Sequence, residues 1–507
     1  MTNTYGNFLK GVDISSLPEH LDGGEKFYTA DGRCVDAFEL LEENHVNSIR
    51  LRIWNEPECV PEAKGYCNLE HTVWMAKRIK AKQMHFMLDF HYSDFWADPG
   101  QQRKPRAWEN LSFEDLKEAV YQYTSEVLQR LQQEGCLPDT VQVGNEIRSG
   151  MLFPDGAVPN YEQLACLVNA GIKAVRAVSP EIEVMIHLDQ GGRFYYLKEW
   201  FDSMFEAGME PIDAIGISFY SFWHGTFMDL RDSMKQLRKR YQVPVYVVET
   251  AHPWRHCEKE HVSKDLMKTA GLPAGVWEQK KSLELVMQIA SSVSGTERTG
   301  VYYWEPLCIP GKTYGSRDEN MGMLDTSGKA LASFETYRDF DAANPAIEDL
   351  DSYIEHLYEV DESELLKEGT NLVPNGDFSD GISGWWVTRQ PEEVVVEERE
   401  QEINVSAKSN FDCDIFRDVY LSTPGKYCLS VEYRGTNTTG VEVTLFLKVI
   451  TCNGEQLFEK RIFPSDVRFV RHELKEMELP AGQVQLGIRM HTPPVFGRIR
   501  RFSLIKE

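Results

Sequence analysis

Two glutamates stand at the ends of apolar runs that are typical of β-strands. Glu146 follows Asn145 in VQVGNEIRSG, and Glu249 lies near the end of VPVYVVET, about 100 residues later. Glycoside hydrolases that retain the anomeric configuration use two carboxylates of this kind, here placed at different strand ends, one as acid/base and the other as nucleophile. A single glutamate at a strand end more often just pairs with a lysine or arginine. It is the pair, within the pattern around it, that indicates catalysis.

Eight short apolar runs in the first two-thirds of the chain would position these glutamates. They are FLKGVDIS, NSIRLRIW, HFMLDFH, TVQVGNEI, EVMIHLDQ, AIGISFYS, VPVYVVET and GVYYWEP. Amphipathic stretches of helix length, such as residues 114–135 and 161–178, separate most of them. Alternating strands and helices predict a parallel sheet, and eight units favour a closed (β/α)₈ barrel. A doubly wound open sheet is the alternative, but the Gly-rich loop that usually follows its first strand is missing.

Polar and aromatic side chains gather at the carboxyl ends of these runs, where a barrel builds its active site. They are Asp13, Arg50, Arg52, Trp54, Asp89, His91, Asn145, Glu146, His187, Asp189, Tyr220, Glu249, Trp304 and Glu305. Strand-end capping explains several of them individually, but not their recurrence at all eight runs.

The composition narrows the class of protein. A chain of 507 residues with 26% charged and 42% apolar residues is ordinary for a soluble protein and has room for two domains. Its net charge of −25 disfavours nucleic acid and anionic membranes as partners. The N-terminal residues lack a basic and apolar leader, and the ten cysteines form no paired motif. We therefore expect a cytoplasmic protein, the alternative being a secreted one whose signal segment is absent from this sequence.

Changes in the residue pattern along the sequence predict the domain boundaries. We expect a (β/α)₈ barrel over residues 1–345, an acidic helix and linker over 346–369, and a β-sandwich over 370–507. The last region holds short alternating runs separated by Gly, Pro and Asn turns, such as KYCLSVEYRG and QVQLGIRMHT. That pattern is typical of an all-β sandwich or jelly roll.

The barrel region resembles glycoside hydrolase family 53, the endo-β-1,4-galactanases. The similarity is carried by GVDISSL (11–17), VNSIRLRIWNEP (46–57), LDFHYSDFWADPGQQRKPRAW (88–108), VQVGNEIRSGMLFPDG (141–156), MIHLD (185–189), SFYSFWHG (218–225), VVETAHPW (247–254) and VYYWEP (301–306). The stretch FHYSDFWADPG is much more specific than a lone Asn-Glu. The resemblance implies a retaining enzyme, an arabinogalactan endo-β-1,4-galactanase (EC 3.2.1.89), that cleaves galactan or galacto-oligosaccharides.

The same resemblance assigns roles to residues. It implies Glu146 as acid/base and Glu249 as nucleophile. It also implies that Arg50 supports the nucleophile, that Asn145 contacts the sugar 2-hydroxyl and that Tyr220 hydrogen-bonds the nucleophile. His91 and Trp304 would line the subsite where cleavage occurs, and Asp89 is a further candidate for substrate binding. Trp54, Trp96 and Trp223 are additional candidates for stacking on a pyranose.

Some positions depart from the family pattern. Phe219-Tyr220-Ser221 stands where Tyr-Tyr-Pro is common, and His252 replaces an aromatic residue. The segment RHCEKEHVSKDLMKTAGLPAG differs from the Asp/Asn-rich loop that holds calcium in some bacterial members. We therefore expect no cofactor or metal, with calcium unsupported by this loop.

The C-terminal region resembles carbohydrate-binding jelly rolls through NLVPNGDFSDGISGWW. Trp385 and Trp386 are either a stacking platform or core, and core is favoured. Tyr433, Arg434, Arg489 and His491 are candidates for a concave binding face. For the whole chain, two alternatives stay open: a sister β-glycanase or oligosaccharide-trimming galactosidase with the same glutamates, and a non-catalytic glycan-binding protein.

Overall fold

The computed structural model of the chain describes residues 5–256, 267, 270–295, 297–309, 319–343, 345–358, 370–380, 382–387, 394–399, 401–407, 411–435, 442–451, 453–462, 469–492 and 496–507. Contacts divide the chain into two compact units. The first comprises Met1–Glu260 and Leu272–Ile354, and the second comprises His261–Gly271 and Glu355–Glu507. None of the described helices is long and apolar enough to cross a membrane.

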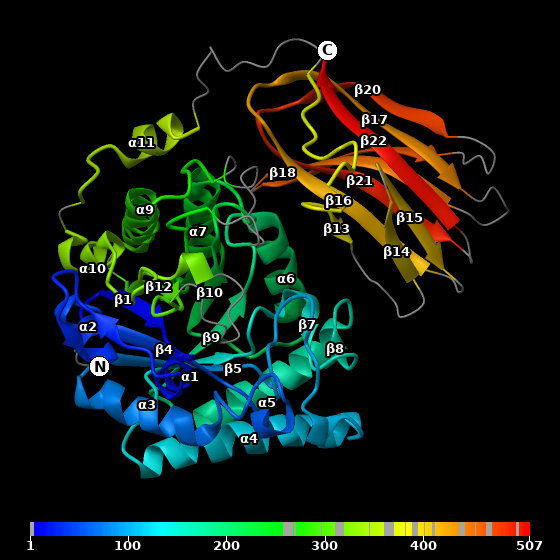
Figure 1. Ribbon diagram of the computed structural model, residues 1–507. Coiled ribbons are helices and arrows are strands. Elements are labelled where there is room, and N and C mark those ends of the chain that lie inside the picture. The colour runs from blue at the N-terminus through cyan, green and yellow to red at the C-terminus, as the bar shows by residue number, and fades with distance from the viewer. Residues whose placement is uncertain are drawn as a thin grey trace. The chain divides into compact units, whose positions relative to one another are not determined.

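The first unit is a closed barrel of eight parallel strands with helices around it (Figure 1). In barrel order the strands are β1 (Phe8–Asp13), β12 (Thr299–Trp304), β11 (Val245–Thr250), β10 (Ala214–Ser218), β9 (Glu183–Leu188), β6 (Thr140–Val143), β5 (His85–Phe90) and β4 (Ser48–Ile53). Each coincides with one of the eight apolar runs of the sequence, so the predicted (β/α)₈ fold is confirmed.

Helices and short elements connect the strands of this unit or follow its last strand, and α11 extends across the boundary between the two units. The helices are α1 (Leu17–Asp22), α2 (Ala37–Glu43), α3 (Leu69–Ala81), α4 (Phe113–Gln133), α5 (Tyr161–Val178), α6 (Phe194–Glu206), α7 (Phe227–Tyr241), α9 (Val276–Ser294), α10 (Glu335–Asp339) and α11 (Leu350–His356). The 3₁₀ turns are η1 (Pro57–Cys59), η2 (Arg106–Trp108), η3 (Ile147–Ser149), η4 (Glu319–Met321) and η5 (Ala332–Phe334). Two short hairpins pair β2 (Phe27–Tyr28) with β3 (Cys34–Val35) and β7 (Gly150–Met151) with β8 (Gly156–Ala157).

Side chains fill the barrel interior, as they do in barrels of this size. One buried cluster contains Leu9, Met87, Met185, Ala214, Tyr246, Val248 and Tyr302. A Cβ on Gly11 would lie 2.3 Å from a ring carbon of Tyr302. Glycine at this point of β1 therefore lets the large ring of Tyr302 occupy the interior beside it.

Residues at helix starts show why the helices begin where they do. Asn68, Ser112 and Asn160 accept hydrogen bonds from backbone N–H groups in the first turns of α3, α4 and α5. Thr226 forms a capping box with Asp229 at the start of α7. These side chains satisfy N–H groups that the helix itself leaves without partners.

The C-terminal unit contains two five-stranded sheets, ordered β13-β16-β21-β18-β19 and β14-β15-β22-β17-β20 (Figure 1). The strands are β13 (Trp386–Val387), β14 (Val394–Arg399), β15 (Glu402–Ala407), β16 (Phe411–Leu421), β17 (Gly425–Gly435), β18 (Glu442–Thr451), β19 (Gly454–Ile462), β20 (Val470–Leu479), β21 (Gly482–Thr492) and β22 (Phe496–Lys506). The paired strands within these sheets are antiparallel. Side chains from both sheets form one apolar core, which confirms the all-β prediction for this region.

The aromatic residues considered as candidates for glycan binding in the sandwich differ in their exposure. Trp385 is 6% exposed and packs against Phe378 and Phe502, so the preference for core is confirmed. Trp386 is 41% exposed. Tyr433 is buried in the core of the sandwich, so the suggestion that it lines a binding face is wrong. The alternation along β17 turns its side chain inward.

Candidate active site

A buried arginine stands at the centre of the barrel's carboxyl-end face. Arg50 is 1% exposed and lies within 2.9 Å of three carboxylates. Its Nη1 contacts Asp13 Oδ2 and Glu249 Oε1, both at 2.9 Å, and its Nη2 contacts Asp89 Oδ2 at 2.8 Å. Burial would lower the pKa of Arg50, but these carboxylates raise it above its ordinary value. The guanidinium therefore stays charged and holds together the ends of β1, β4, β5 and β11.

Glu249 reaches this network because β11 is irregular at its end. The pairing with β10 is Ile217↔Val247 and then Ser218↔Glu249, which indicates one extra residue in β11. Such bulges re-aim side chains and are common beside active sites. Glu249 Oε2 also accepts a hydrogen bond from the hydroxyl of Tyr220 at 3.2 Å.

The pKa of Glu249 reflects opposing influences. Burial raises the pKa of Glu249 to about 7, and the neighbouring carboxylates Asp13 and Asp89 act in the same direction. Arg50 and the Tyr220 hydroxyl lower it. The ion pair with Arg50 thus favours the ionised carboxylate, which a nucleophile requires.

Glu146 lies in a different environment. It follows β6 in the left-handed conformation, with φ 47° and ψ 47°, directly before η3. Ser218 Oγ lies 2.5 Å from Glu146 Oε1. Burial raises the pKa of Glu146 well above its ordinary value, and the nearby charges of Glu249 and Asp189 raise it further. No ion pair to Glu146 occurs in the described part of the chain, so its protonated form is favoured.

A hydrogen-bonded chain connects Glu146 to Asn145 through His187. The ring nitrogens of His187 lie 2.9 Å from Asn145 Oδ1 and 2.8 Å from Ser218 Oγ. Burial lowers the pKa of His187 well below its ordinary value, so the ring is neutral. Because Asn145 Oδ1 also accepts from Arg50, the network assigns the His187 proton to Nδ1. Nε2 then accepts from Ser218, and an ionised Glu146 competes with His187 for the single hydroxyl proton.

Asn145 is fixed at several of its atoms. Its Oδ1 accepts from Arg50 Nη2 at 2.9 Å, and its Nδ2 donates to the carbonyl of Ala97 at 2.8 Å. Gln102 donates to the carbonyl oxygen of Asn145, and Gln142 accepts from Arg50 Nε at 2.6 Å. The second proton on Asn145 Nδ2 has the chemistry required to donate to a sugar hydroxyl.

His91 is a buried neighbour of Asp89. Its Nε2 lies 3.1 Å from Asp89 Oδ2, while its Nδ1 accepts from Trp54 Nε1 and from the backbone N–H of Ala97. Two donors at Nδ1 place the His91 proton on Nε2, directed at Asp89. Burial would raise the pKa of Asp89, but Arg50 and His91 bring it below its ordinary value. Both nitrogens of His91 are therefore engaged within the protein.

The four tryptophans proposed to stack on sugar differ in exposure. Trp54 is 3% exposed and packs on Phe95 and Trp96, so the suggestion that it stacks on sugar is wrong. Trp96 and Trp304 are partly exposed, with ring centroids 6.3 Å apart. Trp223 is partly exposed and lies beside Tyr220. Trp96, Trp223 and Trp304 are thus the ones left with accessible surface.

Hydrogen bonds and ion pairs join the predicted site residues other than Trp304 into one connected set. Glu249, Tyr220, Asn145, Asp89 and His91 are all linked to Arg50 directly or through one neighbour, and Ser218 connects Glu146 to the same set. The sequence assigned no role to Asp13, Gln142, His187 or Ser218. Asp13 and His187 carried a signal as polar strand ends. Ser218 lies inside the run AIGISFYS and ends β10, but only the fold shows that it touches Glu146.

The prediction that the loop after β11 binds no calcium concerns residues that lie mostly outside the described part of the chain. Residues 257–266 and 268–269 of the segment after β11 lie outside the described part of the chain. The prediction that this segment binds no calcium therefore stays a prediction.

Comparison with known proteins shows the family of the chain. The model of glycosyl hydrolase family 53 matches residues 9–337. The chain therefore belongs to glycoside hydrolase family 53, as its motifs indicated.

Three individual proteins illustrate the similarity. An "uncharacterized protein in bgaB 5'region" of Niallia circulans is 42% identical over 348 residues, which cover 65% of this chain and 93% of that protein. The endo-beta-1,4-galactanase of Bacillus subtilis is 33% identical and covers 64% of this chain and 76% of its own length. The solved Ignisphaera aggregans GH53 catalytic domain matches with a TM-score of 0.61 and 36% identity, covering 66% of this chain and 96% of that domain.

Proposed function

We propose that this protein is a retaining endo-β-1,4-galactanase (EC 3.2.1.89) that hydrolyses β-1,4-galactosidic bonds in galactan and galacto-oligosaccharides. Family membership and the similarity to the Bacillus subtilis endo-beta-1,4-galactanase support the substrate class. The site supports the reaction class, since it contains two acidic side chains whose pKa values are raised by burial, and the charge of Glu249 raises the pKa of Glu146 further.

The observation that carries the mechanism is the unequal setting of the two glutamates. Glu249 is paired with Arg50 at 2.9 Å, whereas Glu146 contacts a neutral hydroxyl. The first setting stabilises a carboxylate, and the second, with burial, stabilises a carboxylic acid. Glu249 is therefore the nucleophile and Glu146 the acid/base.

The reaction follows as a double displacement. A carboxylate oxygen of Glu249 attacks the anomeric carbon while the glycosidic C–O bond breaks, and Glu146 gives its proton to the departing oxygen. Glu146, now ionised, takes a proton from water, and the resulting hydroxide equivalent attacks the same carbon and releases Glu249. Each displacement inverts the anomeric centre, so the product keeps the β configuration.

The surrounding residues position substrate and stabilise charge. Asn145 Nδ2 is the candidate donor to the sugar 2-hydroxyl, an interaction that strengthens at the transition state. Tyr220 and Arg50 hold the leaving nucleophile in the second step. Trp304 and Trp96 offer ring surface for a pyranose, and His91 acts by orienting Asp89 because its own nitrogens are engaged.

The test is a substrate screen with product sizing. The protein is assayed on β-1,4-galactan, β-mannan and short galacto-oligosaccharides, and NMR follows the anomeric configuration of the first product. We expect internal cleavage of galactan and initial release of β-anomers. Release of α-anomers would contradict the retaining mechanism. Activity on mannan alone would favour a sister β-glycanase, and galactose release from chain ends alone would favour a trimming galactosidase.

A non-catalytic glycan-binding protein is the second kind of function to test. It predicts binding of galactan without turnover at any pH. The intact pair of Glu146 and Glu249, each in a setting suited to one role, argues against it. Turnover that is lost on Glu249→Ala would exclude it.

A further inference from the structure

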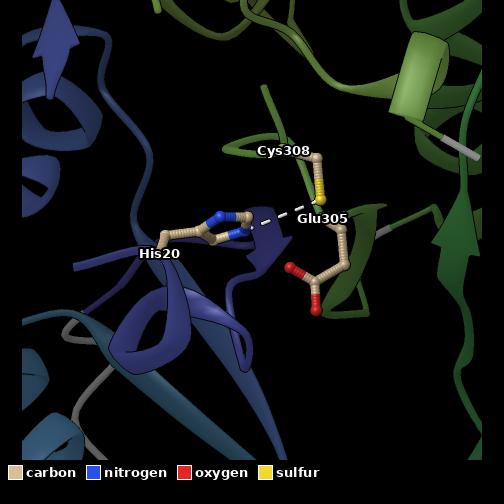
Figure 2. A group of neighbouring side chains, drawn as sticks. All are labelled: His20, Glu305 and Cys308. Atoms are coloured by element: carbon tan, nitrogen blue, oxygen red, sulfur yellow. Dashed lines mark hydrogen bonds between the residues drawn. The ribbon is translucent and has the colours of Figure 1, made fainter. Parts of the chain in front are cut away.

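Three buried side chains with metal-binding atoms meet on one side of the barrel face. His20 lies on α1, and Glu305 and Cys308 follow β12 (Figure 2). One ligand atom from each lies within 4.8 Å of the others, and His20 Nε2 is 3.7 Å from Cys308 Sγ. They are 2%, 2% and 3% exposed, respectively. The mechanism above uses none of them.

The backbone brings these residues together from opposite ends of the barrel sequence. The strands β1 and β12 are neighbours, which places the segments that follow them side by side. The amide of Cys308 donates to the carbonyl of Glu305 at 3.3 Å, and this turn puts both side chains at one place. After α1 the chain returns, and the amide of Glu25 donates to the carbonyl of His20 at 3.1 Å.

One oxygen of Glu305 lacks a hydrogen bond. Oε1 accepts from Arg52 Nη1 at 2.6 Å and from Ser16 Oγ at 2.7 Å. Oε2 is buried and has no hydrogen-bond partner among the described residues. Leaving a buried carboxylate oxygen unpaired is costly, and a bound ion or water is one way in which native proteins satisfy such an atom. This orphan is independent of the clustering of the three residue types.

We propose that His20, Glu305 and Cys308 bind a divalent transition-metal ion of the Zn²⁺ type. Zinc takes imidazole, thiolate and carboxylate ligands at about 2.0–2.3 Å in a tetrahedral arrangement. Those bond lengths put neighbouring ligand atoms roughly 3.4–3.6 Å apart. His20 Nε2 and Cys308 Sγ form a hydrogen bond at 3.7 Å, and this separation is close to that spacing. Thiolate and imidazole also disfavour calcium and magnesium, which prefer oxygen.

Neighbouring charges fit a bound cation. Glu25 Oε2 lies 2.8 Å from His20 Nδ1, the ring nitrogen that faces away from the site. Metal-binding histidines commonly contact a carboxylate through this second nitrogen, which orients the ring. Arg52 is positive, but it is already paired with Glu305 and lies 3.8 Å from Asp13. The carboxylates of Glu25 and Glu305 and a Cys308 thiolate supply the negative charge that the metal needs.

The site would act as a structural clamp. It joins α1, which follows the first barrel strand, to the turn after the last strand. The barrel closes by pairing these two strands. Because the site stands on atoms outside the catalytic set, failure of the metal proposal and failure of the galactanase proposal give different experimental results.

The first experiment uses the full chain and Co²⁺ as a spectroscopic substitute for Zn²⁺. Protein stripped with a chelator is titrated with Co²⁺ in the absence of thiol reductants. We expect one Co²⁺ per chain, tetrahedral d–d bands in the visible and a thiolate-to-cobalt charge-transfer band in the near ultraviolet. Zn²⁺ should displace the Co²⁺ and raise the melting temperature. A folded wild-type protein that shows no charge-transfer band and no stoichiometric Zn²⁺ binding would overturn the proposal.

Variants then locate the site. Cys308→Ser should abolish the charge-transfer band, and His20→Ala should abolish tight binding. Glu25→Gln should weaken Zn²⁺ binding by about 10–100-fold while leaving the band in place at saturation, as an orienting neighbour would. Cys136→Ser, which replaces another buried barrel cysteine, is the matched control and should change neither.

Circular dichroism establishes that each variant is folded before metal is added. An unchanged band in folded Cys308→Ser, or its loss in Cys136→Ser, would show that the metal sits elsewhere and would overturn the assignment. If Cys308→Ser does not fold, the wild-type titration and the Glu25→Gln variant still test the proposal. An unaltered Zn²⁺ affinity of Glu25→Gln would contradict the proposed orientation of His20.

Discussion

The ends of the barrel strands and the interior of the sandwich are both built from β-strands, yet they bury opposite chemistry. The barrel face buries Asp13, Arg50, Arg52, Asp89, Glu249 and Glu305. The described core of the sandwich is apolar, with Asn404, Arg417, Ser430 and His472 as its buried polar residues. Burying charge is expensive even when the charges are paired, and such pairs are weak evidence of stability. The barrel face is therefore built for reaction, and the sandwich interior for stability.

The largest expected effect tests the chemical side of this comparison. Glu249→Ala removes the atom that forms the covalent intermediate, so turnover of galactan should fall by about 10⁴-fold or more. Added azide should restore turnover and yield an α-linked product, because one displacement replaces two. Steady-state kinetics and NMR measure both results. Glu126→Ala, on an exposed position of α4, is the control and should leave the rate unchanged.

Glu146→Ala should have a smaller effect that depends on the substrate. Loss of general acid catalysis should slow galactan hydrolysis by about 10²–10⁴-fold. An aryl galactoside substrate with a good leaving group needs little protonation, so its first step should be largely spared. The ratio of the two rates is the measurement. Identical losses on both substrates, or identical behaviour of the Glu146 and Glu249 variants, would contradict the assigned roles.

A pair of adjacent tryptophans tests the stability side. Trp385 packs in the sandwich core, and its indole donates to the carbonyl of Asn375. Trp385→Ala should lower the free energy of unfolding of this unit by about 3–5 kcal/mol. Trp386→Ala, at a 41% exposed position, should change it by less than about 0.5 kcal/mol. Denaturant unfolding of the two variants measures the difference, and comparable losses would show that the interior is not the source of stability.

The pH dependence of kcat/KM for the wild-type enzyme should reflect the pKa values of Glu249 and Glu146. Glu249 must be ionised, so kcat/KM should fall as the pH drops below about 7. Glu146 must be protonated, and its pKa lies well above the ordinary value, so the alkaline limb lies at higher pH. The apparent pKa values that define the two limbs belong to the pair of glutamates together and not to either glutamate alone.

Tyr220→Phe sharpens this prediction. The Tyr220 hydroxyl lowers the pKa of Glu249, so its removal should move the acid limb upward by up to about one unit, which corresponds to roughly 1.4 kcal/mol. The alkaline limb should hardly move. A downward shift of the acid limb would contradict the placement of the hydroxyl on the ionised nucleophile.

The smallest expected effect concerns the separation of the two regions. Residues 1–369 without the sandwich should keep their rate on short galacto-oligosaccharides, because the catalytic network lies within the barrel. If the sandwich binds glycan, its removal should reduce action on polymer several-fold, since tethering raises local concentration. The rates on short galacto-oligosaccharides and on polymeric galactan are measured for the truncated and the full-length protein. Equal activity on every substrate would leave the binding role without support.

The sequence predicted the eight barrel strands because each is a strongly apolar run with a polar end. It named no run for β14 or for β19, and the residues of β19 are mostly exposed, so that its run GEQLFEKRI lacks an apolar signal. It named both glutamates because each follows such a run. It omitted Ser218 and wrongly offered Trp54 and Tyr433 as surface residues. Contacts between strand ends, and the face to which an aromatic ring turns, arise only when the chain closes into a barrel or sandwich.

Sharing one guanidinium among three carboxylates has a consequence for how this site can change by mutation. Substituting Asp13, Asp89 or Glu249 alters the charge balance of the other two through Arg50, so their effects should not add. Beneficial single steps within such a set are rare, because most intermediates leave a buried charge uncompensated. Laboratory evolution towards a new glycan should therefore keep these four residues and accumulate its changes at the partly exposed aromatic positions around them.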